Sequence, residues 1–303
     1  MQDTIEQKGK CKVYNIRFRN LTDLYDYLKS NPKVNTKVFT RQASIKNDVL
    51  FAGEPLPQAI EYCIGGYDKG FDNFLSTNAQ LKTAAKELTD NRTLVRTIYG
   101  GIPQPALVAA GVPDCMLRYE RDTTTAVRNI YFNLAYSAQN TTGKIVNRGL
   151  ATLYLVQALE SKGEIVNFKA FELSKNDDED EIINIELNLK KPGDLFLNIE
   201  KCYYPIKSKE FLRRVLFRVK ESSKVEDYYW GDGYGQALTA SEMRTFLGAK
   251  PHDLVISCPE EMGIEGNNIY DDTVALIQTL GIEKEFDVPK ILSLKEKSST
   301  RKF

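Results

Sequence analysis

The chain has 303 residues, of which 42% are hydrophobic and 27% charged, and its 41 basic residues balance 41 acidic ones. A neutral chain has no general attraction for nucleic acid or for an anionic membrane, so neither is indicated as a partner. No apolar run is long enough to span a bilayer and the first ten residues hold no hydrophobic signal region, so we expect a cytoplasmic protein. The five scattered cysteines include no CxxC pair, which argues against a zinc site and a disulfide framework.

The first 113 residues predict a smaller α+β region. Residues 12–18 (KVYNIRF) have the composition of a strand, and three helices are expected after it, over residues 20–31, 56–64 and 72–88. Residues 100–113 (GGIPQPALVAAGVP) are rich in glycine and proline, which is typical of a connector or a domain boundary.

A strand–helix–strand unit follows and is the clearest pattern in the chain. Residues 127–134 form a β-rich run, and residues 144–162 hold good helix formers over a length that excludes a strand. Gly163 stands where a helix C-cap favours a left-handed residue, and a second strand begins directly after it. Such a unit predicts two parallel strands. Residues 183–189 alternate apolar and polar, so we expect a half-exposed strand that turns back antiparallel at the sheet edge.

The C-terminal third predicts further helices and one short buried strand. Residues 208–220 form an amphipathic helix, residues 253–257 a strand, and residues 271–280 a helix. We expect the basic residues around the first helix to reach into solvent, with contact to nucleic acid as the alternative: Lys207, Lys209, Arg213, Arg214, Arg218 and Lys220. Residues 289–303 are rich in lysine and serine and predict a flexible tail.

In its order of elements, the segment 114–288 resembles the von Willebrand factor A-type domain. The resemblance implies an α/β fold with a doubly wound sheet and helices on both faces. Many members of that family bind a divalent metal through an Asp-x-Ser-x-Ser motif after the first strand. The matching positions here are Asn133, Ala135 and Ser137, which lack the leading carboxylate and the first hydroxyl. Hard cations need oxygen ligands with negative charge, so we expect a degenerate site without a metal.

The whole chain is also similar to an uncharacterised family of phage-encoded proteins. Three segments carry this similarity: PDCMLRYE (113–120), RGLATLYLVQALESKG (148–163) and FLRRVLFRV (211–219). The resemblance implies a phage inhibitor of a bacterial defence complex, of the anti-Gabija kind. The partner would then be a host protein complex that contains a nuclease, met in the host cytoplasm. Homo-oligomerisation stays open.

No catalytic constellation stands out, so we expect a non-catalytic protein without a cofactor. The single histidine, His252, has no nucleophile motif near any serine to serve, and the glycines of 231–236 match no phosphate loop. Tyrosine and tryptophan dominate interface hot spots, so six aromatic residues are the candidate protein-binding set: Tyr203, Tyr204, Tyr228, Tyr229, Trp230 and Tyr234. Two alternatives remain. One is a virion assembly component, and the other is a metal-assisted phosphodiesterase or nuclease that uses Glu260, Glu261 and Asp271.

Overall fold

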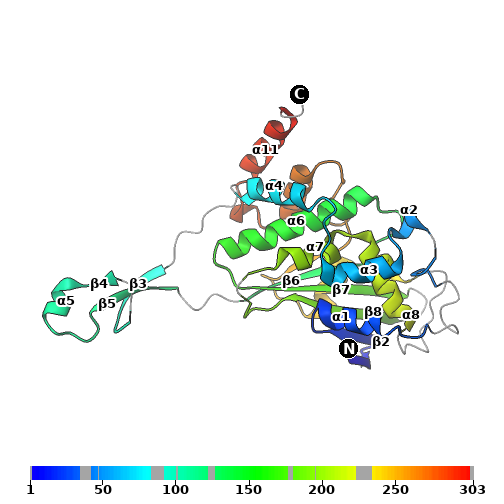
Figure 1. The fold of residues 1–303 in the computed structure, drawn as a ribbon, viewed down its shortest axis with the longest axis horizontal. Coiled ribbons are helices and arrows are strands. Elements are labelled where there is room, and N and C mark those ends of the chain that lie inside the picture. Colours follow the sequence, from blue (N-terminus) through cyan, green and yellow to red (C-terminus); the bar gives the residue numbers. More distant parts are fainter. Residues whose placement is uncertain are drawn as a thin grey trace.

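A seven-stranded mixed sheet forms the centre of the molecule (Figure 1). In chain order its strands are β1 (Gln2–Lys8), β2 (Cys11–Phe18), β6 (Arg128–Asn133), β7 (Val166–Asn176), β8 (Glu181–Lys190), β9 (Gln236–Ala237) and β10 (Leu254–Ile256). Their spatial order is β1-β2-β8-β7-β6-β10, and β9 pairs with the end of β7. The computed structural model describes residues 2–34, 42–46, 48–82, 92–99, 102–121, 127–176, 180–194, 196–222 and 234–300.

Strands β6, β7 and β8 confirm the predicted unit and so the α/β class. β6 and β7 are parallel and are joined by helix α6 (Thr142–Ser161), whereas β8 returns antiparallel to β7. Gly163 has φ +89°, the left-handed conformation expected after a helix. β10 pairs in parallel with the other side of β6, so the chain leaves β6 towards β7 and later returns beyond it. The C-terminal ends of β6 and β10 therefore form a switch point, where open α/β sheets bind ligands.

The N-terminal residues belong to the same sheet. β2 pairs in parallel with β8, and β1 pairs antiparallel with β2. The prediction that β8 lies at the sheet edge is wrong, and the sheet crosses the expected boundary between residues 1–113 and 114–288. The alternation of apolar and polar residues predicts strand β8 but does not identify β2 as its pairing partner. The paired residues are almost 170 positions apart in the sequence, and Asn184 Nδ2 of β8 donates to Asn15 Oδ1 of β2 at 2.8 Å.

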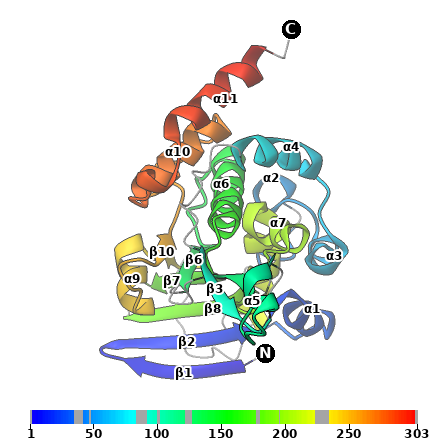
Figure 2. The same cartoon turned by 90° about the vertical axis from the view of Figure 1, so that its left-hand side faces the viewer.

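Helices cover both faces of the sheet, and Figure 2 shows α9 on the opposite side from α1 and α7. One face carries the larger hydrophobic cluster, which includes residues of every helix in this list: α1 (Leu21–Lys29), α3 (Leu56–Gly65), α4 (Phe71–Lys82), α6, α7 (Ile199–Lys207), a π-helical segment η1 (Phe211–Leu216), α8 (Phe217–Ser222), and α10 (Ile269–Thr279). On the other face, Met243 of α9 (Ala240–Leu247) packs with Phe171, Leu173 and Val255. Within the described ranges, no helix combines the length and apolar character needed to cross a membrane.

The last described residues are helical as far as Thr300, whereas a flexible tail was expected over 289–303. A short 3₁₀ turn, η2 (Glu283–Glu285), leads into α11 (Val288–Thr300). Ile291 is fully buried and Leu294 packs against the core, while Lys295 Nζ lies 2.7 Å from Asp271 Oδ2. The lysine- and serine-rich composition of residues 289–303 predicts a flexible tail. Two apolar residues one turn apart are nevertheless enough to hold such a helix against the core.

A second, three-stranded sheet lies apart from the main body in Figure 1. We call it the arm and define it as residues 92–99 and 102–121. It contains β3 (Arg92–Thr97), β4 (Ile102–Pro103), helix α5 (Pro105–Ala109) and β5 (Met116–Arg121), with β5 between the other two strands. The glycine- and proline-rich segment expected to be a connector thus supplies β4 and α5. The remaining helix, α2 (Val49–Ala52), is a single turn on the main body.

Candidate functional site

Asn133 ends β6 and uses its amide to hold the switch point together. Its side chain is fully buried. The amide oxygen accepts hydrogen bonds from Ala135 N at 3.0 Å and Leu173 N at 3.1 Å, and the amide nitrogen donates to Leu173 O at 3.1 Å and Leu238 O at 3.5 Å. The side chain therefore bridges β6, β7 and the residue after β9. Ser137, the other polar position of the degenerate motif, is exposed and accepts from Gln139 N at 3.3 Å.

The carboxylates proposed for a metal-dependent alternative have separate partners. Glu261 accepts from Ala240 N at 2.8 Å and from the hydroxyl of Ser257. Asp271 pairs with Lys295 on α11, and Glu260 is exposed. Over the part of the chain that the structure describes, no three histidine, cysteine or acidic side chains converge in a way that could hold a metal ion.

The aromatic residues expected at an interface fall into two groups. Tyr203 and Tyr204 are each 1% exposed, because Pro205 and the rest of α7 lie against the core, so their assignment to a protein-binding surface is wrong. Tyr234 stacks on Phe217 with 3.8 Å between ring centroids, and its hydroxyl donates to Glu221 at 2.6 Å, which makes it a packing residue too. The others lie outside the described residues, and their role stays a prediction: Tyr228, Tyr229 and Trp230.

Of the six basic residues expected to reach into solvent, Arg213, Arg214 and Lys220 are buried, which corrects the expectation for them. The other three are partly exposed: Lys207, Lys209 and Arg218. The first part of the helix over residues 208–220 is the π-helical segment η1, and all six residues of η1 are buried. Arg214 is 2% exposed and donates to five backbone carbonyls, those of Ser44, Lys46, Asp48, Gly53 and Glu54. It therefore fastens the segment before α3 to the core. Arg213 is 4% exposed and donates to Phe51 O at 2.6 Å and Ala138 O at 3.3 Å.

Arg148 is a second buried arginine at the switch point, and the sequence analysis did not single it out. It lies on α6, is 1% exposed, and donates through Nη1 to Ser257 O at 2.5 Å. Its guanidinium lies over the ring of Phe132 and within 5.7 Å of the ring centroid of Tyr136. Burial lowers the pKa of Arg148 to about 10, so the group stays charged at neutral pH. An arginine within the apolar run of residues 144–162 was the signal that could have revealed it.

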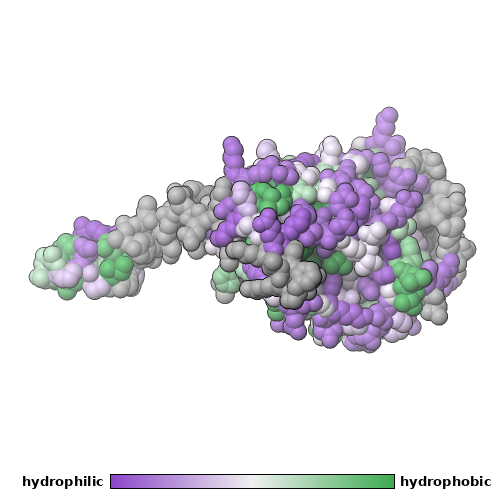
Figure 3. Space-filling model, turned by 90° about the horizontal axis from the view of Figure 1, so that it is seen from above, coloured by the Kyte–Doolittle hydropathy of each residue, from purple (hydrophilic) through white to green (hydrophobic). Residues whose placement is uncertain are grey.

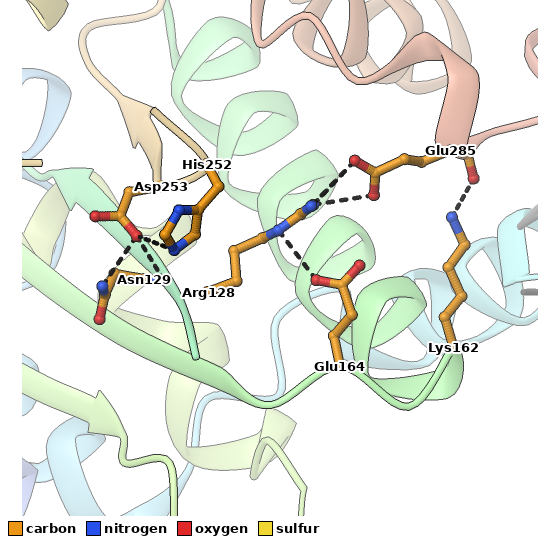
Figure 4. A network of polar contacts seen from close by, with 7 residues as sticks. All are labelled: Arg128, Asn129, Lys162, Glu164, His252, Asp253 and Glu285. Atoms are coloured by element: carbon orange, nitrogen blue, oxygen red, sulfur yellow. Dashed lines mark hydrogen bonds and ion pairs between the residues drawn. The ribbon is translucent and has the colours of Figure 1, made fainter. Parts of the chain in front are cut away.

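The N-terminal edge of the same strands holds a different polar network (Figure 4). Arg128 lies between two carboxylates, with Nε 3.0 Å from Glu164 Oε2 and Nη1 2.9 Å from Glu285 Oε2. Burial raises the pKa of Glu164, although Arg128 acts in the opposite direction. Beside it, the buried carboxylate of Asp253 accepts hydrogen bonds from Asn129 N and Nδ2. Nε2 of the partly exposed His252 lies 3.5 Å from Asp253 Oδ1. These contacts fasten β6, β7, β10 and η2, so we assign them to stability.

A hollow of about 500 Å³ opens on the α9 side, between that helix and strands β2, β7 and β8. Its size falls in the range of small-molecule sites. The Lys175–Glu242 ion pair, at 2.7 Å, belongs to its wall, as does Phe246 with the ammonium of Lys8 over its ring. The charged groups of Lys8, Lys175 and Glu242 are thus already hydrogen-bonded to other residues of the wall.

The arm presents several exposed apolar side chains. Tyr99 is 72% exposed, Ile98 55%, Val108 52% and Ile102 41%. Figure 3 shows hydrophobic residues in green on the arm, away from the main body. In a small sheet that buries little of its own surface, such side chains are typical of a contact surface.

No curated protein and no solved structure matches the chain. A protein-family model does match it, over residues 3–284, and so includes the central sheet, the switch point and the arm. That model describes a domain of unknown function, DUF7192, and its length covers most of the chain. The chain therefore belongs to the DUF7192 family.

Proposed function

We propose that the protein is a non-catalytic binding protein that acts by contacting a host protein assembly in the cytoplasm. The observation that carries the proposal is the arm, whose exposed apolar residues stand apart from the main body (Figure 1). Tyrosine buries a large area at low cost in conformational entropy, so Tyr99 is the natural anchor of such a contact. A specific interface buries roughly 800 Å² on each partner, more than the arm's exposed apolar residues alone provide. The contact therefore extends from the arm onto the neighbouring surface.

The sequence resemblance to phage proteins suggests which assembly this is. We propose a Gabija-type defence nuclease complex, which the protein would inhibit by occupying its surface. The arrangement at the switch point supports a binding role. The side-chain amide of Asn133 is hydrogen-bonded to backbone groups. The carboxylate of Glu261 accepts from Ala240 N, and that of Asp271 pairs with Lys295. The von Willebrand A-like order of strands, with β8 reversed beside β7-β6-β10, would then serve as a scaffold.

Replacing Tyr99 tests the arm directly. Tyr99→Ala should weaken binding to the purified nuclease complex by more than about 1 kcal/mol, roughly fivefold in Kd, because a truncated anchor loses its buried area. Biolayer interferometry with the intact protein measures this change.

Leu50→Ala is the control, since Leu50 is a 92% exposed apolar residue of α2, at the opposite end of the main body from the arm (Figure 1). It should leave Kd within about twofold of the wild type, as surface substitutions outside an interface do. Equal affinities for the wild type and a folded Tyr99→Ala variant would remove the arm from the interface.

A further inference from the structure

Two buried guanidinium groups flank one tyrosine at the C-terminal end of β6. Arg148 reaches this place from α6 and Arg213 from η1. Their central carbons lie 5.7 Å and 5.3 Å from the ring centroid of Tyr136. Elements far apart in the chain thus bring two positive charges to the switch point. The exposed residues Ser137 and Ala138 directly follow Tyr136 there.

No described carboxylate forms an ion pair with Arg148 or Arg213, and the hydrogen bonds that both groups donate go to backbone carbonyls. Acidic side chains act on them only from farther away, Asp48 and Glu210 on Arg213 and Glu260 on Arg148. Burying a charged group costs several kcal/mol unless it is paired, so the arrangement favours an added negative charge. Arg214 differs, because its five carbonyl partners use its whole guanidinium.

Two hydrogen-bond donors at the same place are also unused. Arg148 Nε is buried without a partner, and so is the hydroxyl of Tyr136. A buried polar group without a hydrogen-bond partner destabilises the fold, so such groups are rare unless a ligand or water satisfies them. Here both can donate, which specifies a ligand with acceptor oxygens.

We propose that Arg148, Arg213 and Tyr136 bind a phosphate group at the switch point. Guanidinium groups match the oxygens of phosphate in geometry and charge, and ligands of open α/β sheets bind beyond the carboxyl ends of the strands. Many von Willebrand A-type domains bind a cation at the matching place, whereas the side chains present in this chain favour the opposite charge. The phosphate comes either from the free ion or from a nucleotide. This site is independent of the arm and of its partner.

Isothermal titration of the intact protein with inorganic phosphate, at constant ionic strength in chloride, tests the site. We expect saturable binding of one phosphate, and a rise in Tm that chloride and acetate do not reproduce. Titration with ADP distinguishes the sources, because a nucleotide site binds ADP at least about tenfold more tightly than phosphate, and a site for the free ion does not. Either result supports the proposal.

Arg148→Gln should weaken phosphate binding at least about tenfold, since it removes a charge-assisted contact. The control Arg218→Gln, on α8, should leave phosphate binding unchanged, because Arg218 contacts Asn31 and Pro32 instead. If Arg148→Gln does not fold, Arg213→Gln and protection of residues 133–140 from hydrogen exchange by phosphate give the same information. No phosphate-specific binding by the wild type, or unchanged binding by a folded Arg148→Gln variant, would overturn the proposal.

Discussion

The side chain of Asn133 forms its hydrogen bonds with backbone groups. Its oxygen accepts from two N–H groups and its nitrogen donates to two carbonyls, all in the fully buried centre of the sheet. A carboxylate at this position could keep the first pair of bonds but not the second, because an ionised carboxylate only accepts. The amide is thus a structural requirement of the way β6, β7 and the residues after β9 meet.

Asn133→Asp should therefore destabilise the protein by about 2–4 kcal/mol at neutral pH, because the new carboxylate would face the carbonyls of Leu173 and Leu238. Urea unfolding measures the loss. Asn73→Asp, an exposed position in the first turn of α4, should change stability by less than about 0.5 kcal/mol. A variant Asn133→Asp that is as stable as the wild type, or that Mg²⁺ stabilises, would contradict this assignment.

Residue type alone could not predict which aromatic and basic side chains are exposed. Tyr203 and Tyr204 were expected at a surface, but they pack in the core, while Tyr99 was not selected and is 72% exposed. The basic pattern around residues 208–220 predicts solvent-exposed cations, yet Arg214 is buried because backbone carbonyls of a distant segment accept its hydrogen bonds. Arg148, which no pattern singled out, is buried in a similar way. Such acceptors come together only in the folded chain, so no local pattern announces them.

At the scale of the element, η1 shows the limit of helical periodicity. The segment 211–219 has an apolar pattern that fits an α-helix with one polar face, and a helix was correctly expected there. The π-helical turns change the angle between successive side chains, so Arg213 and Arg214 both point into the protein. By contrast, α6 follows its sequence closely because its N-cap, Thr141, and the left-handed Gly163 after its C-cap are local signals.

Helix α8 ends on a buried ion pair that couples it to β7. Lys220 Nζ lies 2.5 Å from Glu172 Oε1 and also donates to Ser174 and to Tyr234 O. Burial raises the pKa of Glu172 and lowers that of Lys220, and each partner opposes the shift of the other. The pair is therefore stable only while both members are present.

Lys220→Met should cost about 3–5 kcal/mol of stability, because it leaves Glu172 buried without its counter-ion. The double variant Lys220→Met with Glu172→Leu should recover most of this loss, as apolar replacements of buried pairs do. Chemical denaturation of the three proteins measures the coupling. Lys175→Met, which breaks a partly exposed pair with Glu242, is the control and should cost at most about 1 kcal/mol. Additive effects at Lys220 and Glu172 would show that the two side chains do not depend on each other.

At the scale of the whole molecule, local signals identified the α/β class and the β6–α6–β7 unit, and long-range pairing decided the rest. Nothing in residues 12–18 indicates that β2 pairs with β8. The arm escaped prediction because its glycines and prolines are typical of a connector. The result is a main body with two buried arginines at its switch point and a separate arm with exposed apolar side chains.

The most direct test of the proposed function is sedimentation of the intact protein with a purified Gabija-type nuclease complex. We expect a stable assembly with a Kd at or below about 1 µM, and a loss of nuclease activity that follows the fraction of complex bound. Two separate boundaries at about 10 µM of each folded component, together with full nuclease activity, would contradict it.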